Sequence, residues 1–256
     1  MTALALAYSP VLGKFAIAAD GLSASEIAPI IIDTEQAQKI FPFQHKHDSI
    51  ALAFAGLGRT RTNSFNMVTE STKQMDTLIK RPFQNGYELA YKFRFNMIKT
   101  LEKALGDGRI AAFTVHSESA NRTLVVIFYI FGYFKQEPFW VTTEIFYDIS
   151  DHTFSVEPTE PNLKQFQFVS TGSYPIGQMF YNQIPFDPRL ADRKYLVSET
   201  SVPLEAVHKF VQTCALPIAR EVDPWCRGIG GHIHAAELSA SGFQWAIEPK
   251  RSATHQ

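Results

Sequence analysis

Four residues near the start of the chain have the types and spacing needed for amide hydrolysis: Thr2, Asp20, Lys39 and Gly56. A threonine hydroxyl is a poor nucleophile until a base removes its proton, and a threonine at the amino terminus carries such a base in its own α-amine. Because Thr2 directly follows Met1, and a small second residue generally permits removal of the initiator Met, we expect a free threonine amine. Such a residue can attack an amide carbonyl, form an acyl ester and release it by hydrolysis.

The other three residues supply what this nucleophile requires. A free α-amine has a pKa near ~8, and an adjacent ammonium lowers that pKa so that the amine can act as a base at neutral pH. Lys39 is the candidate for the ammonium, and Asp20 is the candidate for the counter-charge that holds it. Gly56 is the candidate backbone N–H donor to the tetrahedral intermediate, because a residue without a side chain lets the substrate approach closely.

Two predicted hairpins would position these residues. Their apolar runs, each pair separated by a polar turn, cover residues 3–8 with 15–19 and residues 39–43 with 50–55. Antiparallel pairing then places Thr2 opposite Asp20 and Lys39 opposite Gly56, in each case at the end of the hairpin away from its turn. The sequence therefore predicts that the four groups can meet at one end of a sheet.

The remaining chain alternates between helical and strand-like spacing. Helical spacing begins near residue 61 and continues to residue 105 with a break at Pro82, and Leu89, Phe93, Met97 and Leu101 share one face. Further strands are predicted over residues 123–134, 139–149, 152–156, 165–169, 233–238 and 243–247. A short helix is expected after Ser173, and a longer one from Val202 to about Arg220.

This order of elements predicts the class and the layers of the fold. Strands, two helices, strands, two helices and final strands are typical of an α+β protein in which two antiparallel sheets lie between helix layers, a four-layer αββα sandwich. We assign residues 1–247 to a single domain and the polar residues 248–256 to a flexible tail.

At these motifs the sequence resembles the proteasome β-subunit superfamily, including the peptidase of the bacterial two-component ATP-dependent protease. The matching elements are Thr2 after Met1, Phe15-Ala-Ile-Ala-Ala-Asp20, Gln38-Lys39-Ile40, Phe54-Ala55-Gly56, the Ser170-Thr171-Gly172-Ser173 turn and Gly230-Gly231. The sequence departs from the family pattern at Gly21-Leu22, where a small residue and Arg are usual, and at Cys226, which stands at the spacing of a Ser. The resemblance is therefore to a divergent, bacterial-type member.

The resemblance implies the N-terminal-nucleophile hydrolase fold and a threonine-type peptidase activity. Thr2 would be both nucleophile and base, with Lys39, Asp20 and Gly56 in the roles given above. Thr171 falls where the family has a hydroxyl that helps to orient the threonine amine, and Asp223 matches a late acidic residue that supports the site from behind.

The resemblance also implies a substrate pocket and an assembly. Phe54 and Gly58 would flank the first substrate pocket, with the bulky Phe54 leaving less room there. Self-association into a homo-oligomer such as a ring is expected, and an ATPase partner is compatible with the family although the sequence itself shows none.

Composition limits the other classes of function. A net charge of -1 gives no electrostatic reason to expect a nucleic-acid or acidic-membrane partner. The most apolar stretch, residues 123–134, is shorter than the about 20 residues that cross a bilayer. The amino terminus lacks the basic start and long apolar run of a secretory signal, so we expect a cytoplasmic protein.

Other chemistries receive less support from the sequence. His232 and His234 alternate on a predicted strand, but no third ligand lies nearby in sequence, so no metal and no other cofactor is predicted. Cys214 and Cys226 lack the Cys-x-x-Cys spacing of a redox pair, and reduced thiols are expected. Two alternatives stay open: a catalytically inactive structural or regulatory subunit that retains Met1, and an amidase of the same fold that acts on small molecules.

Overall fold

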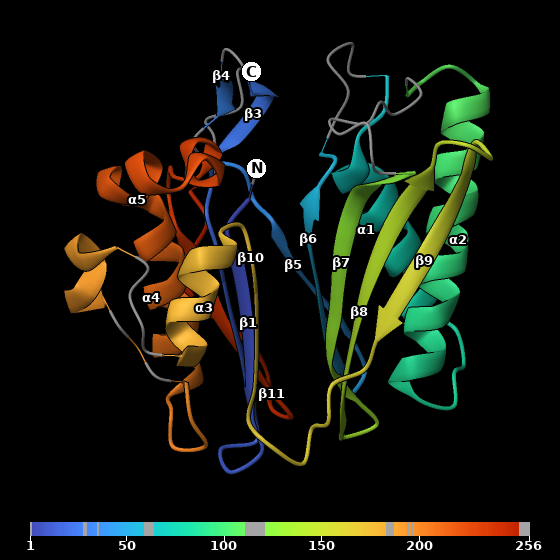
Figure 1. Cartoon of the computed structure of the whole chain (residues 1–256). Helices are drawn as coiled ribbons and strands as arrows, with labels where there is room; N and C mark the ends of the chain where they lie inside the picture. Colours follow the sequence, from blue (N-terminus) through green and yellow to red (C-terminus); the bar gives the residue numbers. More distant parts are fainter. Residues whose placement is uncertain are drawn as a thin grey trace. The chain divides into compact units, whose positions relative to one another are not determined.

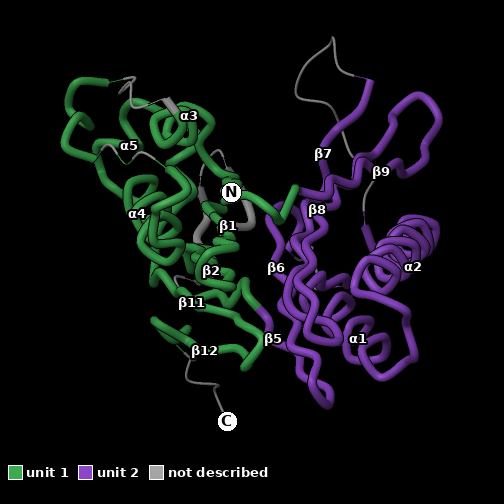
Figure 2. The backbone as a smooth tube through the Cα atoms, turned by 90° about the horizontal axis from the view of Figure 1, so that it is seen from below, with its two compact units in different colours: residues 1–40, 162–256 green, residues 41–161 purple. Residues whose placement is uncertain are grey.

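The chain divides into two compact units, which Figure 2 draws in different colours. A computed structural model describes residues 2–27, 30–34, 36–58, 64–110, 121–182, 187–193, 195 and 197–250. Unit 1 contains residues 1–40 and 162–256, and unit 2 contains residues 41–161. The assignment of residues 1–247 to a single domain stays a prediction, and most of the expected tail, residues 251–256, lies outside the described residues.

Unit 1 is built on a five-stranded antiparallel sheet with strand order β10-β1-β2-β11-β12. Its strands are β1 (Leu4–Ser9), β2 (Lys14–Ala19), β10 (Gln167–Thr171), β11 (His234–Ser239) and β12 (Gly242–Ile247). Alternation along β1 sends Ala3, Ala5 and Ala7 into the cluster formed with the helices, and Leu4 and Leu6 to the other face. The small alanine side chains let the helices approach the sheet closely.

Helices cover one face of this sheet (Figure 1). They are α3 (Tyr174–Asn182), α4 (Pro203–Ala215) and α5 (Pro217–Val222), with 3₁₀ turns η1 (Pro188–Arg193) and η2 (Pro224–Gly228). The single helix predicted from Val202 to Arg220 was wrong. Leu216 adopts an extended conformation (φ -64°, ψ 144°), because a residue before proline is disfavoured in the helical region, and Pro217 then starts α5.

Unit 2 contains a second five-stranded antiparallel sheet, with strand order β5-β6-β7-β8-β9. Its strands are β5 (Ile40–His45), β6 (Asp48–Gly56), β7 (Arg122–Phe134), β8 (Glu137–Asp148) and β9 (Thr153–Thr159). Helices α1 (Met67–Leu78) and α2 (Gly86–Gly106) lie on one face of this sheet (Figure 1). Asn66 and Asn85 cap the two helices by accepting the amides of Thr69 and Glu88.

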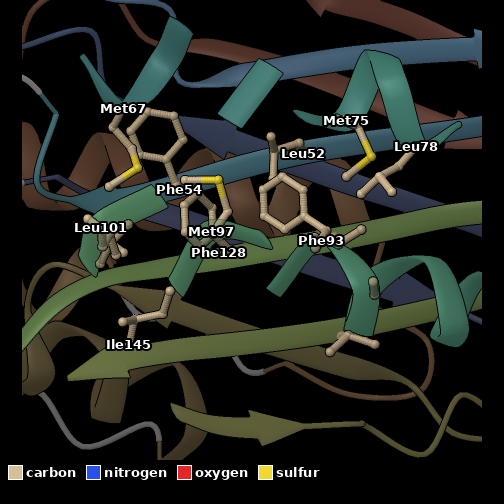
Figure 3. Close-up of a cluster of buried hydrophobic side chains, with 14 of the residues drawn as sticks. Leu52, Phe54, Met67, Met75, Leu78, Phe93, Met97, Leu101, Phe128 and Ile145 are labelled. Atoms are coloured by element: carbon tan, nitrogen blue, oxygen red, sulfur yellow. The ribbon is translucent and has the colours of Figure 1, made fainter. Parts of the chain in front are cut away.

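The apolar face predicted for α2 is confirmed. Phe93, Met97 and Leu101 are fully buried and belong to the same cluster as Leu52 and Phe128 of the sheet (Figure 3). Phe93 packs edge-on against Phe128 with ring centroids 5.2 Å apart. Spacing of four residues therefore identified the core-facing side of this helix correctly.

Two features of the strands differ from the sequence-based predictions. Strands β3 (Ser23–Ile27) and β4 (Ile30–Thr34) form a separate two-stranded sheet that was not predicted. In the first hairpin Leu4 pairs with Ala19, so the continuing register places Ala3, and not Thr2, opposite Asp20. The predicted register was wrong by one residue.

The α+β class and the two antiparallel sheets are confirmed. Each unit combines one five-stranded antiparallel sheet with its own helices. Among the helices in the described part of the chain, none has the length and apolar character needed to cross a bilayer.

Candidate functional site

Asp20 follows the end of β2 and binds four groups in unit 1. Oδ1 accepts the amide of Ala3 at 2.9 Å and the ammonium of Lys39 at 2.7 Å. Oδ2 accepts the amides of Leu22 at 3.3 Å and Gly230 at 3.1 Å. The carboxylate is fully buried, and its many donors compensate for the loss of hydration. Asp20 therefore fixes four chain segments around one charge.

Lys39 stands directly before β5, and the structure brings it to Asp20 as the sequence predicted. Its ammonium also donates to the carbonyl oxygen of Leu22 at 2.7 Å, which accounts for two of its three protons. The side chains of Lys39 and Asp20 are only 9% and 0% exposed. Burial lowers the pKa of Lys39, and the charge and hydrogen bond of Asp20 oppose that shift.

Thr2 lies beside this ion pair through its peptide bond to Ala3. The amide nitrogen of that bond and the Lys39 ammonium share the same oxygen of Asp20, so they lie no farther apart than the sum of the two hydrogen-bond lengths. A second bond, from the Asp20 amide to the Ala3 carbonyl at 3.0 Å, fixes the chain just after Thr2. The Thr2 side chain itself is partly exposed.

Gly172, which follows the end of β10, lies close to the Thr2–Ala3 segment. A Cβ placed on Gly172 would lie 3.0 Å from both the Ala3 Cα and the Thr2 carbonyl oxygen, and its φ of +125° disfavours any other residue. Thr171 pairs with Leu4 in the β1–β10 ladder. Because cross-strand partners share a face, Thr171 projects away from the α3–α5 helices, on the side of Leu4. Its expected contact with the Thr2 amine stays a prediction.

Asp223 is buried, and its principal side-chain partner is Ser173, a residue that sequence reasoning did not select. Ser173 Oγ donates to Asp223 Oδ2 at 2.5 Å, and it also accepts the amide of Ile176 in the first turn of α3. Asp223 Oδ1 accepts the amide of Trp225 at the start of η2. The Ser-Thr-Gly-Ser turn was noticed in the sequence, but nothing local indicates which of its hydroxyls meets an acid 50 residues later.

Two buried thiols, Cys214 and Cys226, lie near Asp223. Cys226 Sγ is 3.9 Å from Asp223 Oδ2, and Cys214 hydrogen bonds with Cys226. Burial raises the pKa of Cys214, and the charge of Asp20 adds to that shift. A fully buried thiol with a raised pKa is a poor nucleophile, which describes Cys214, whereas the hydrogen bond with Cys214 lowers the pKa of Cys226. The charge of Asp20 reaches Cys214, so the Asp20 and Asp223 clusters are neighbours in unit 1.

His234 holds the backbone of Lys39 through a hydrogen bond. Its Nε2 accepts the backbone amide of Lys39 at 3.2 Å, which requires that this nitrogen be unprotonated. Burial, and secondarily the Lys39 charge, lower the pKa of His234 to about 4. His232 Nε2 instead lies 2.6 Å from the Glu248 carbonyl oxygen. The described residues contain no group of three metal-ligating side chains around either histidine.

The other three predicted site residues belong to unit 2. Gly56 ends β6 with φ +113°, and a Cβ there would lie 2.4 Å from the Val125 carbonyl oxygen, so strand packing alone excludes a side chain. Phe54 is 5% exposed and stacks on Phe41 at a centroid distance of 6.0 Å. Gly58 has open space around the position of a Cβ. The roles of these residues toward substrate stay predictions.

The arrangement in unit 1 provides a buried ammonium, a carboxylate that holds it and Thr2 next to both. A buried ammonium lowers the pKa of any amine held close to it, because like charges disfavour protonation. A search against protein-family models and a search of curated proteins found no match to this chain.

Proposed function

We propose that this chain is an N-terminal threonine hydrolase that cleaves peptide bonds through an acyl ester on Thr2. The observation that carries the proposal is the buried Lys39–Asp20 pair, whose shared oxygen also accepts the first amide after Thr2. A buried ion pair is costly to desolvate, so it is weak evidence for a contribution to stability. Its position beside an amino-terminal hydroxyl gives it a chemical use.

The reaction begins when the Thr2 amine takes the proton of its own hydroxyl and the oxygen attacks the substrate carbonyl. The C–N bond then breaks as the amine returns the proton to the leaving nitrogen, which leaves an acyl ester. Water, deprotonated by the same amine, attacks the ester and restores the hydroxyl. Lys39 lowers the pKa of the Thr2 amine through its charge, and Asp20 holds Lys39 in place.

The remaining residues are proposed to assist at separate steps. The Gly56 amide would donate to the tetrahedral oxyanion, a contact whose loss typically reduces kcat by roughly 10²–10³. Thr171 would orient the Thr2 amine. Asp223 would position the Thr2 segment indirectly, because its partner Ser173 follows Gly172, which contacts the Thr2 carbonyl. Phe54 and Gly58 would bound the first substrate pocket.

The proposal includes the fold and the assembly of the proteasome β-subunit superfamily. Each sheet bears helices on one face and apolar side chains on the other, among them Leu6 in β1 and Phe131 in β7. A sheet with two apolar faces needs other elements packed against both faces, and this requirement favours a four-layer αββα sandwich. A cytoplasmic homo-oligomer, with or without an ATPase partner, completes the proposal.

The decisive experiment combines intact mass with a threonine-directed electrophile. We expect the mature protein to begin at Thr2, to gain one adduct mapped to Thr2, and to cleave peptide substrates from a panel. Thr2→Ala should abolish turnover without changing the melting temperature, whereas Thr2→Ser should retain a nucleophile and part of the activity.

The two alternatives give different outcomes in the same experiment. Retention of Met1 with no adduct would identify an inactive subunit. Adduct formation together with hydrolysis of small amides alone would identify a small-molecule amidase. Turnover that persists in Thr2→Ala would refute the mechanism.

A further inference from the structure

A cavity of about 830 Å³ lies at the end of the unit 2 sheet where β6 begins, the opposite end of that strand from Gly56. It is formed by the β5–β6 turn at residues 45–48, the α1–α2 connection at residues 79–83 and the β7–β8 turn at residues 134–136. The β5–β6 and β7–β8 turns lie at the lower ends of their strands in Figure 1. The cavity shares no residue with the candidate site.

The lining of the cavity is strongly cationic. Lys46, Lys80, Arg81 and Lys135 line it, and Asp48 is the single carboxylate among the described lining residues. Asp48 Oδ1 is already occupied by the backbone amide of Lys135 at 2.7 Å. Because the whole chain carries a net charge of -1, this concentration of positive charge is a local feature and attracts anions.

All four cations are exposed, and one of them, Lys135, also links two of the turns. The Lys135 ammonium donates to the carbonyl oxygens of Phe83 at 2.9 Å and Gln84 at 3.2 Å, which ties the β7–β8 turn to the α1–α2 connection. Lys46, Lys80 and Arg81 are exposed, and they form no ion pair within the described part of the chain. Lys135 thus joins two turns of the cavity wall, and the lining carries more cations than carboxylates.

The backbone of the turns supports a role for their side chains. Lys46, Lys135 and Gln136 have φ values of 55°, 51° and 69°, and they are three of the four non-glycine residues with positive φ in the described chain. This conformation costs an ordinary residue about 1 kcal/mol or more, and glycine would adopt it without that cost. Three long polar side chains therefore occupy a backbone conformation that carries a local energetic cost.

The floor of the cavity is apolar. Pro82 is exposed and Phe83 is partly buried, and these two residues give the lining its accessible apolar surface; Ile79 and Phe134 of the same lining are only 3% and 4% exposed. A compact inorganic anion would satisfy the cations but leave this surface uncovered. A ligand that carries carboxylates next to an apolar side chain complements both parts.

We propose that this cavity is a docking site for a short acidic peptide segment of a partner protein, with carboxylates that pair with Lys46, Lys80 and Arg81 and an apolar side chain that packs on Pro82 and Phe83. The inference does not depend on the proposed hydrolase activity. Charge complementarity favours an acidic segment, and the apolar surface of Pro82 and Phe83 favours a peptide side chain over a compact inorganic anion.

The test is binding of a neutral-dye-labelled peptide of alternating glutamate and leucine residues, followed by fluorescence anisotropy. We expect saturable binding that weakens with salt, and a loss of at least about tenfold in affinity for the Lys46→Glu/Arg81→Glu double variant. The matched control is Lys92→Glu/Lys99→Glu, the same charge change on α2, where both ammonium groups lie over the Phe95 ring. Its affinity should change by less than about twofold.

Three outcomes would overturn the proposal. Equal losses in the two double variants would show that net charge alone attracts the peptide. Equal binding of a peptide with glutamine in place of glutamate would remove the ionic basis of recognition. Inorganic tripolyphosphate that binds as tightly as the peptide would identify an oligophosphate site instead. Melting curves of each variant establish that the loss is not due to unfolding.

Discussion

The ammonium of Lys39 lies 2.7 Å from Oδ1 of Asp20, although the two residues are 19 positions apart. Asp20 directly follows β2, and Lys39 directly precedes β5. The same oxygen accepts the amide that follows Thr2. Any change in this ion pair is therefore transmitted directly to the start of the chain. The four predictions below test this relationship and the groups around it.

Replacement of Lys39 by methionine should abolish catalysis and destabilise the protein. The variant leaves the Asp20 carboxylate buried without its counter-charge, which typically costs about 3–5 kcal/mol. Activity per folded molecule should fall by about 10² or more, because the Thr2 amine loses the charge that keeps it unprotonated. Denaturant unfolding and kcat measure the two effects.

Lys14→Met serves as the control for that variant. Lys14 pairs with Glu237 at 3.4 Å, but the two side chains are 44% and 29% exposed. Solvent screens such a pair, so stability should change by less than about 1 kcal/mol and kcat should be unchanged. Full activity in Lys39→Met would contradict the role assigned to the ammonium.

Ser173→Ala should lower kcat through its effect on the position of Thr2. The substitution leaves the buried Asp223 carboxylate without its hydroxyl donor, at a cost of about 1–3 kcal/mol. Ser173 is a positioning residue here, so kcat should fall by about tenfold while KM stays unchanged. Ser71→Ala is the matched control, because Ser71 is also buried and donates to a backbone carbonyl in α1. An equal loss of kcat in both variants would assign Ser173 a purely structural role.

Gly172→Ala should displace the Thr2 segment. Gly242→Ala isolates the backbone contribution, since Gly242 has a similar φ of +129° but no heavy atom within 4 Å of the added Cβ. Both variants should lose about 1–3 kcal/mol from the unfavourable conformation. Only Gly172→Ala, whose Cβ would lie 3.0 Å from Ala3 and the Thr2 carbonyl, should also lose activity. Equal activity in the two variants would show that this contact does not position Thr2.

Stability should fall as the pH is lowered from about 6.5 to about 4, because the buried His234 stays neutral in the folded protein. Its folded pKa of about 4 lies below the ordinary value of 6.5, so only the unfolded chain binds a proton within this window. The difference amounts to about 3 kcal/mol, fully present above the unfolded pKa and lost as the pH falls to the folded pKa. Lys39 and His232 are the charged or titratable groups that act on this ring.

His234→Gln removes this titration and keeps an acceptor for the Lys39 amide. Urea unfolding at a series of pH values should give a smaller loss of stability for the variant across the same window. NMR titration of the His234 ring provides the direct measurement. Identical slopes for variant and wild type would show that His234 is not the group responsible.

The periodicity of apolar residues along the sequence predicted the helices of unit 2 more accurately than those of unit 1. The face of α2 formed by Phe93 and Leu101 follows directly from a spacing that repeats with the helix. The break between α4 and α5 was also present in the sequence as Pro217, but the apolar periodicity on both sides of it hid the interruption. Strands β3 and β4 were missed although residues 30–32 are three consecutive isoleucines, a run with high strand propensity.

The sequence by itself determined which residues could do chemistry and which elements carry them. Asp20 at the end of a strand and Lys39 at the start of another were both found in this way, because strand limits depend on nearby residues. The pairing of Thr2 with Asp20 was predicted one residue out of register, since the four residues of the first turn, 10–13, do not reveal their conformation in the sequence.

Only the tertiary structure decided which distant groups meet. Ser173 and Asp223 are 50 residues apart, and His234 reaches the amide of Lys39 across 195 residues. Such contacts depend on the packing of α3 and η2 within unit 1 and on the place of β11 in its sheet, which no local periodicity encodes. Burial in that packing also sets the low pKa of His234, because the cost of charging a side chain depends on what surrounds it in space.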